Sequence, residues 1–180
     1  MRLTLSRRTT APALLAFTVL LGGTTAACSG ASRSEAPGGT AAAGTAAAAV
    51  VPSGNVIIPT DAEVAAAWDR RPEFVRALPE DWQAAYKFAL ARPDVIGWMP
   101  CNCGCGADGH RSNLDCFFGR RESGEITFQE HGSYCDICVE TSNLAATLLD
   151  EGKSMAEIRA AVDATFGGGG HSTDTPLPPA

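Results

Sequence analysis

The chain of 180 residues lacks most of the motifs by which enzymes and nucleic-acid-binding proteins are recognised. It contains no Gly-rich phosphate loop, no Gly-x-Ser-x-Gly nucleophile turn and no His-Glu-x-x-His helix. Past its first residues it has no run of Lys and Arg, and acidic residues outnumber basic ones by 20 to 14. We therefore predict a protein that is not an enzyme and has no nucleic-acid partner.

Long hydrophobic runs are also missing. The apolar stretch 11–21 is too short to span a bilayer as a permanent helix, and no later stretch is long and uncharged enough. This stretch follows Arg7 and Arg8 and precedes small residues that lead to Cys28, which is the layout of an export signal. We predict that residues 1–27 are an export signal peptide and that the protein works outside the cytoplasm.

The end of this signal indicates how the protein is held at the membrane. Residues 25–28 read Thr-Ala-Ala-Cys, which resembles the lipobox of bacterial lipoproteins with Thr in place of the usual Leu. We predict lipidation at Cys28 and anchoring at the outer face of the cytoplasmic membrane. The alternative is an ordinary secretory signal that contains a cysteine. Residues 6–8 read Ser-Arg-Arg, so twin-arginine export and general secretion are both open.

The remaining chain is acidic and its two ends are poor in bulky apolar residues. Removal of residues 1–27, with three Arg and no acidic residue, leaves 11 basic and 20 acidic residues and a net charge of −9. Membrane contact would then come through Cys28 alone. The Ala/Gly/Ser/Pro composition of residues 28–55 predicts a disordered tether, and the Gly- and Pro-rich residues 167–180 predict a disordered tail. The folded domain is expected over residues 56–166, with a thin core.

Helical periodicity dominates this domain. Helices are predicted over residues 61–70, 80–91 and about 136–149, with a short helical turn over 95–99. Ser154 and Glu157 form a capping box that opens a last helix. Extended pieces at 116–118 and 126–128, across a turn at 121–124, would form one short β-hairpin at most. The predicted fold class is mainly α, a small single helical domain with a Cys-rich loop.

Six cysteines lie in the predicted domain, at Cys101, Cys103, Cys105, Cys116, Cys135 and Cys138. A disulfide within a Cys-x-Cys pair would close a small, strained ring, so a shared metal or reactive dithiol chemistry suits this spacing better. Gly104 and Gly106 would relieve the backbone as the loop curls around an ion. Six thiolates would satisfy one tetrahedral zinc site with a pair left over, or a small copper(I) cluster, whereas calcium and magnesium require oxygen ligands. We predict that the six cysteines are ligands of copper(I) or zinc.

Other residues near the thiols are candidates for lesser roles. His110 and His131 lie close to the cysteines in sequence and are candidate additional ligands. Trp98, Phe117 and Phe118 are expected to shield the site from water. His171, in the predicted tail, is assigned no role.

Two alternatives to the binding and transfer of a soft metal ion are open. Six cysteines outside the cytoplasm commonly form three disulfides, so a disulfide-stapled or zinc-stapled interaction domain is the first alternative. A thiol-disulfide redox protein is the second, because Cys135 and Cys138 have a two-residue spacing at a helix start. Thioredoxin-like chemistry, however, expects a βαβ arrangement that this helical chain does not offer.

The order of these residues resembles one known family. Residues 100–105 read Pro-Cys-Asn-Cys-Gly-Cys, and His110, the run 112–117, His131-Gly132 and Cys135-x-x-Cys138 follow at set intervals. This pattern, over about residues 60–166, resembles the PCYCGC-motif bacterial lipoproteins, with Asn in place of the family's Tyr between two ligands. The resemblance implies a secreted or lipid-anchored domain that binds heavy metal, above all copper. We expect it to buffer, deliver or confer resistance to copper(I), with a metal donor or acceptor protein as partner.

Overall fold

The computed structural model describes residues 47–119 and 127–179 of the protein. These residues belong to one compact unit, Ala41–Ala180, and the second unit, Met1–Thr40, lies outside the described residues. In the described part helices dominate, and the strands form two small two-stranded sheets. The prediction of a mainly α domain is therefore confirmed, with one more small sheet than the single hairpin that the sequence indicated.

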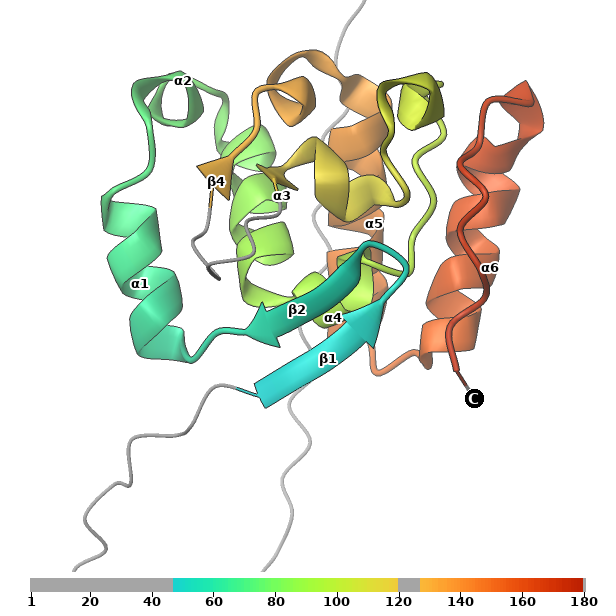
Figure 1. The fold of residues 1–180 in the computed structure, drawn as a ribbon, viewed down its shortest axis with the longest axis horizontal. Coiled ribbons are helices and arrows are strands. Elements are labelled where there is room, and N and C mark those ends of the chain that lie inside the picture. The colour runs from blue at the N-terminus through green and yellow to red at the C-terminus, as the bar shows by residue number, and fades with distance from the viewer. Residues whose placement is uncertain (1–46, 120–126, 180) are drawn as a thin grey trace, which may run out of the picture. The chain divides into compact units, whose positions relative to one another are not determined.

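The elements follow the chain in a simple order (Figure 1). The strands are β1 Ala47–Val51, β2 Gly54–Ile58, β3 Phe118–Gly119 and β4 Thr127–Phe128. The α-helices are α1 Asp61–Asp69, α2 Glu73–Arg76, α3 Glu80–Ala91, α4 Pro93–Ile96, α5 Asp136–Asp150 and α6 Met155–Phe166. The short 3-10 helices are η1 Cys105–Asp108, η2 Asn113–Cys116, η3 His131–Tyr134 and η4 Gly167–Gly169. Helices α1, α3, α5 and α6 appear within a residue or two of their predicted bounds, whereas α2 was not predicted.

The three longest helices form the framework of the domain, with α5 packed against α3 on one side and α6 on the other (Figure 1). Small side chains line these contacts: Ala85 of α3 and Ala145 of α5 are fully buried. The buried hydroxyl of Ser142 donates a hydrogen bond to the carbonyl oxygen of Ala85 at 3.0 Å. Because small side chains permit close approach, this packing fixes α5 firmly against α3. It thereby also fixes the start of α5, where two of the cysteines lie.

Two helices begin with a capping box. The Ser154 side chain accepts a hydrogen bond from the backbone N–H of Glu157, whose carboxylate in turn accepts from the backbone N–H of Ser154. This arrangement confirms the predicted start of α6. Thr60 and Glu63 make the same pair of bonds at the start of α1. Each box satisfies backbone donors that the first turn of a helix leaves without partners.

The hairpin of β1 and β2 corrects the predicted tether. The strands pair antiparallel from Ala47 opposite Ile58 to Val51 opposite Gly54, so residues 47–55 belong to the folded unit rather than to a disordered segment. The Val51 side chain is buried, and it lies so close to Gly97 that a Cβ added there would be 2.6 Å from the Val51 Cβ. Composition misled here because a few β-branched residues at 50–58 suffice to form and anchor a hairpin.

The second sheet consists of β3 and β4, where Phe118 pairs with Phe128 and Gly119 with Thr127. Strand β4 falls within the predicted piece 126–128, whereas β3 begins only at the last residue of the predicted piece 116–118 and extends to Gly119. The predicted turn at 121–124 lies outside the described residues. The ring centroids of Phe118 and Phe128 are 5.0 Å apart in an edge-to-face arrangement, so the pair closes this side of the core.

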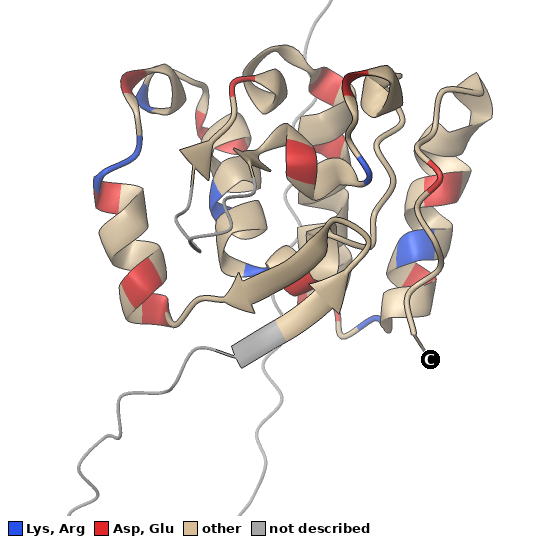
Figure 2. Ribbon diagram, in the orientation of Figure 1, with Lys and Arg blue, Asp and Glu red and all other residues tan. Residues whose placement is uncertain are grey.

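Neither the charge nor the hydropathy of the described part of the chain indicates a membrane-spanning helix. None of the helices described there is both long and apolar enough to cross a bilayer. Acidic residues are distributed over many of the helices, and the few basic residues are scattered among them (Figure 2). The predicted signal peptide 1–27 and lipidation site Cys28 lie outside the described residues.

Candidate metal centre

The loop that carries the first three thiols folds back on itself at two glycines. Gly104 has a φ of 92° and precedes η1, and Gly109, with a φ of 85°, follows it. Side chains other than hydrogen rarely tolerate such positive φ values, so glycine is needed at both positions. The role predicted for Gly104 is confirmed. The same prediction for Gly106 is wrong, because the second glycine with positive φ in this loop is Gly109.

All six predicted cysteines and both candidate histidines meet beside this loop. We call these eight residues the Cys/His cluster: Cys101, Cys103, Cys105, His110, Cys116, His131, Cys135 and Cys138. They come from the loop with η1, from η2, from η3 and from the start of α5. Sulfur atoms from distant segments touch: the Sγ of Cys116 lies 3.3 Å from that of Cys138, and the Sγ of Cys101 lies 3.8 Å from that of Cys138.

The cluster divides into two groups of four potential ligands. The first ligand group is Cys101, Cys105, His110 and Cys116, and the second is Cys103, His131, Cys135 and Cys138. Within each group the four ligand atoms all lie within 4.8 Å of one another. Such spacing suits four donors around a single ion, because zinc–sulfur bonds are about 2.3 Å long and zinc–nitrogen bonds about 2.0–2.1 Å. Each group is therefore able to hold a metal ion.

A glycine permits the approach of the element that carries His131. A Cβ added at Gly132 would lie 2.8 Å from the Phe117 ring and 3.1 Å from the Tyr86 hydroxyl oxygen. That hydroxyl donates a hydrogen bond to the carbonyl oxygen of Gln129 at 2.6 Å, which fixes the chain just before η3. The His131 Nε2 then lies 3.7 Å from the Cys103 sulfur. Only the position of Phe117 in the fold reveals this need for glycine.

Crowding controls the ionisation of the thiols. Hydrogen bonds, first from the Cys116 thiol and then from His131, lower the pKa of Cys103 to about 4. The pKa of Cys116 is raised by its hydrogen bond to Cys103 and by burial, and the pKa of Cys138 is raised by its hydrogen bond to Cys116 and by burial. The pKa of Cys135 is raised by its hydrogen bond to Cys138 and by burial. Without a cation, one thiolate therefore suppresses ionisation of its neighbours, and a bound cation would relieve that repulsion.

The two histidines lie face to edge at the border of the two groups. The centroids of the His110 and His131 rings are 4.9 Å apart, and His110 Nδ1 lies 3.3 Å from the Cys116 sulfur. The pKa of His110 is lowered by burial and then by the charge of His131. A neutral imidazole is the form that binds a metal, so this environment favours ligation by His110.

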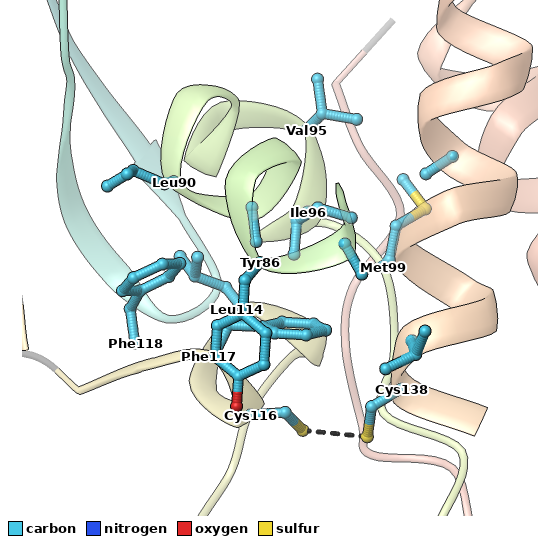
Figure 3. Packing of buried hydrophobic residues seen from close by; sticks show 14 of the residues in the cluster. Tyr86, Leu90, Val95, Ile96, Met99, Leu114, Cys116, Phe117, Phe118 and Cys138 are labelled. Atoms are coloured by element: carbon cyan, nitrogen blue, oxygen red, sulfur yellow. Dashed lines mark hydrogen bonds between the residues drawn. The ribbon is translucent and has the colours of Figure 1, made fainter. Parts of the chain in front are cut away.

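Apolar side chains cover the inner side of the cluster. Tyr86, Met99 and Phe117 are fully buried, and the Tyr86 and Phe117 rings lie beside the contact between Cys116 and Cys138 (Figure 3). The two rings pack edge to face with their centroids 4.9 Å apart. Such surroundings limit access of water to the thiols and favour bonds to a soft ion over hydration. The shielding predicted for Phe117 agrees with its burial.

One pair of cysteines lies at disulfide distance, namely Cys101 and Cys105. Cys103, Cys116, Cys135 and Cys138 are free thiols. The described residues thus contain one such pair instead of the three disulfides of the first alternative. Cys135 and Cys138 are preceded by the 3-10 helix η3 and not by a strand, so they lack the βαβ setting of thioredoxin-like proteins.

The C-terminal segment corrects the sequence prediction. Thr173 donates its backbone N–H to the Cys101 carbonyl oxygen at 2.9 Å, and its hydroxyl oxygen accepts the Cys101 N–H at 2.8 Å. The Thr175 hydroxyl donates to the Arg111 carbonyl oxygen at 2.6 Å, and Arg159 of α6 donates to the Pro176 carbonyl oxygen at 2.9 Å. The prediction of a disordered tail is therefore wrong for residues 167–179, which lie along the thiol loop.

The reason for this error is that the segment is held by hydrogen bonds rather than by apolar burial. Thr173 and Thr175 are 8% and 5% exposed, although their neighbours are glycines, prolines and polar residues. In an extended chain residues two apart point to the same side, so both threonines reach the loop. The prediction of disorder used the low apolar content of the segment, which does not reveal hydrogen bonds between these threonines and the thiol loop.

The fold and the cluster define a class of protein: a small helical domain whose cysteine and histidine groups are able to hold a metal ion. Residues 18–178 match the family described as "Protein of unknown function with PCYCGC motif". The chain belongs to this family, which confirms the resemblance seen in the sequence. No curated protein and no solved structure matches the chain.

Proposed function

We propose that the protein is an extracytoplasmic lipoprotein that binds copper(I) in the Cys/His cluster. It would buffer the ion, deliver it or protect the cell from it, and it would catalyse no reaction of its own. The observation that supports this proposal is the donor set: six thiols and two imidazoles converge, and no carboxylate belongs to either ligand group. Thiolate and imidazole ligands select soft and borderline ions over calcium and magnesium.

The choice of copper(I) over zinc rests on how the sulfurs touch. The Cys101 sulfur lies 3.3 Å from that of Cys103 and 3.4 Å from that of Cys116, so neighbouring ligand positions are in contact throughout the cluster. Thiolates that touch in this way suit an ion that shares sulfur ligands, as copper(I) does. Buried aromatic rings beside the sulfurs would also protect copper(I) from water and oxidation.

The proposed location follows from the first 28 residues of the sequence. Cleavage before Cys28 and lipidation of that cysteine would hold the domain at the outer face of the cytoplasmic membrane. Its partners would be the membrane, through the lipid on Cys28, and a protein that gives or accepts the metal. The net negative charge of the chain disfavours nucleic acid as a partner.

A zinc-stapled domain is the second candidate function. The cluster joins a loop, η2, η3 and the start of α5, which are segments that a structural zinc could tie together. Structural zinc contributes on the order of 10 kcal/mol to the folding of small domains. In that case the ion would be retained and would not be transferred. Thiol-disulfide exchange at Cys135 and Cys138 is a third candidate, with less support because the 3-10 helix η3, and not a strand of a βαβ unit, leads into them.

Anaerobic titration of the compact unit 41–180 with copper(I), in competition with a coloured copper(I) chelator, tests the proposal. We expect the reduced protein to withdraw copper(I) from the chelator. A variant with Ser at Cys101, Cys103 and Cys105 should lose this capacity, whereas the His171→Ala control should keep it, because His171 belongs to neither ligand group. Failure of the unaltered protein to take copper(I), or retention of one zinc that copper(I) cannot displace, would refute the proposal.

A further inference from the structure

The division of the cluster into two complete ligand groups has a consequence for how many ions it holds. When the Cys101–Cys105 pair is reduced, each group contains three thiols and one imidazole, which is a full set of four ligands for one ion. A single ion in the middle of the cluster would leave half of these donors unused. Two ions, one in each group, would use all eight donors.

The alternation of the thiols in the loop distributes them between the groups. Cys101 and Cys105 belong to the first ligand group, and Cys103, which stands between them, belongs to the second. Cys103 meets ligands from η3 and α5, with its sulfur 3.6 Å from that of Cys138 and 3.7 Å from the His131 Nε2. The short Cys-x-Cys-x-Cys motif thus serves two sites at once.

The groups are not separate sites, because their sulfurs touch. Contacts that cross the border include Cys101 to Cys103 at 3.3 Å, Cys116 to Cys138 at 3.3 Å and Cys101 to Cys138 at 3.8 Å. The hydrogen bond between Cys103 and Cys116 crosses it as well. Cys101, Cys116 and Cys138 are at most 1% exposed, so the border lies in the interior. Adjacent thiolates repel each other strongly when their surroundings have low polarity. A cation in each group would offset this repulsion.

We propose that the Cys/His cluster is a two-ion centre, with one copper(I) in each ligand group and the two ions linked through the touching sulfurs. This inference rests on the proposed function. In the fully reduced protein, each thiol that is still protonated releases its proton to solvent when it coordinates an ion, whereas Cys103 binds as the thiolate that it already is. No electron is transferred in this step. The second ligand group is the outer site, since Cys103, His131 and Cys135 are partly exposed, whereas the three cysteines of the first group are buried.

Native mass spectrometry of the anaerobic, reduced unit 41–180 at saturating copper(I) counts the ions directly. We expect two per chain. The double variant Cys105→Ser with His110→Ala should hold one ion, and the double variant Cys135→Ser with His131→Ala should also hold one. These four residues make none of the sulfur contacts that cross between the groups. A variant that combines all four substitutions should hold none.

The outcomes separate this inference from the function on which it rests. If the unaltered protein binds no copper(I), the proposed function fails. Saturation at one ion or at four, or loss of both ions in either double variant, would overturn the two-ion centre and leave copper(I) binding intact. X-ray absorption of the loaded, unaltered protein provides a readout that does not depend on the folding of variants. It should show copper–copper scattering in addition to sulfur and nitrogen neighbours, and its absence would also overturn the inference.

Discussion

The hydrogen bonds between the C-terminal segment and the thiol loop predict that Thr173→Val destabilises the domain. Valine has almost the shape of threonine, so no cavity forms, but the Cys101 N–H loses the hydroxyl oxygen that accepts it at 2.8 Å. Both residues are buried, at 0% and 8% exposure, so water cannot readily replace the lost partner. A buried donor without a partner costs about 1–3 kcal/mol. The Thr175 hydroxyl keeps its bond to Arg111, so no second donor is lost.

Equilibrium unfolding in urea measures this effect, with both proteins under the same redox and metal conditions. We expect a lower midpoint and an unchanged slope, because the same surface is exposed on unfolding. Thr165→Val is the matched control: the Thr165 hydroxyl is exposed and bonds within its own helix, so its replacement should change stability by less than about 0.5 kcal/mol. Equal effects of the two substitutions would refute the view that this segment is an integral part of the domain.

Three further predictions concern packing, pH and redox state. Gly132→Ala should destabilise the domain by about 1–3 kcal/mol in urea, since its methyl group would overlap a buried aromatic ring. Glu157→Gln should lower the urea midpoint of unfolding at neutral pH but not in acid. The hydrogen bond from the backbone of Ser154 lowers the pKa of Glu157 in the folded protein. The carboxylate therefore stabilises the fold above its unfolded pKa, and this stabilisation is lost as the pH falls through the folded pKa. When Cys101 and Cys105 form a disulfide, two thiols of the first ligand group are lost, and native mass spectrometry should count one copper(I) instead of two.

Each of these three predictions has its own control. Gly168→Ala should be close to neutral, because an added Cβ meets nothing within 4 Å there and φ is ordinary. Equal losses of stability in both alanine variants would contradict the steric role of Gly132. A difference in stability between wild type and Glu157→Gln that does not depend on pH would contradict stabilisation by the ionised carboxylate. Equal numbers of bound ions in oxidised and reduced protein would show that Cys101 and Cys105 are not ligands.

Local patterns in the sequence were sufficient to predict most of the helices. Periodic apolar residues located α3 and α5, and the Ser154-x-x-Glu157 box located the start of α6, because these signals act within a few residues of each other. Helix α2 escaped prediction because four residues are too few to show a period. The hairpin at 47–58 and the C-terminal segment escaped for another reason, since both are held by contacts with distant residues.

The ligands of the candidate site were also predictable, but their arrangement was not. The residue types identify a soft-metal site, because thiol and imidazole chemistry is a property of the side chains themselves. Spacing could not show that Cys103 joins Cys135 and Cys138 while its neighbours Cys101 and Cys105 join Cys116. That division depends on the backbone turn at Gly104 and on the approach of η3 and α5 to the loop.

The sequence by itself determined the donor atoms, the helical class and the family of this protein, because composition, helical period and motif order are local properties of the chain. Only the tertiary structure decided that the donors form two touching groups and that residues 171–176 line the loop that carries them. The physical reason is that contacts between residues tens of positions apart depend on how α3, α5 and α6 pack, and packing is a property of the whole folded unit.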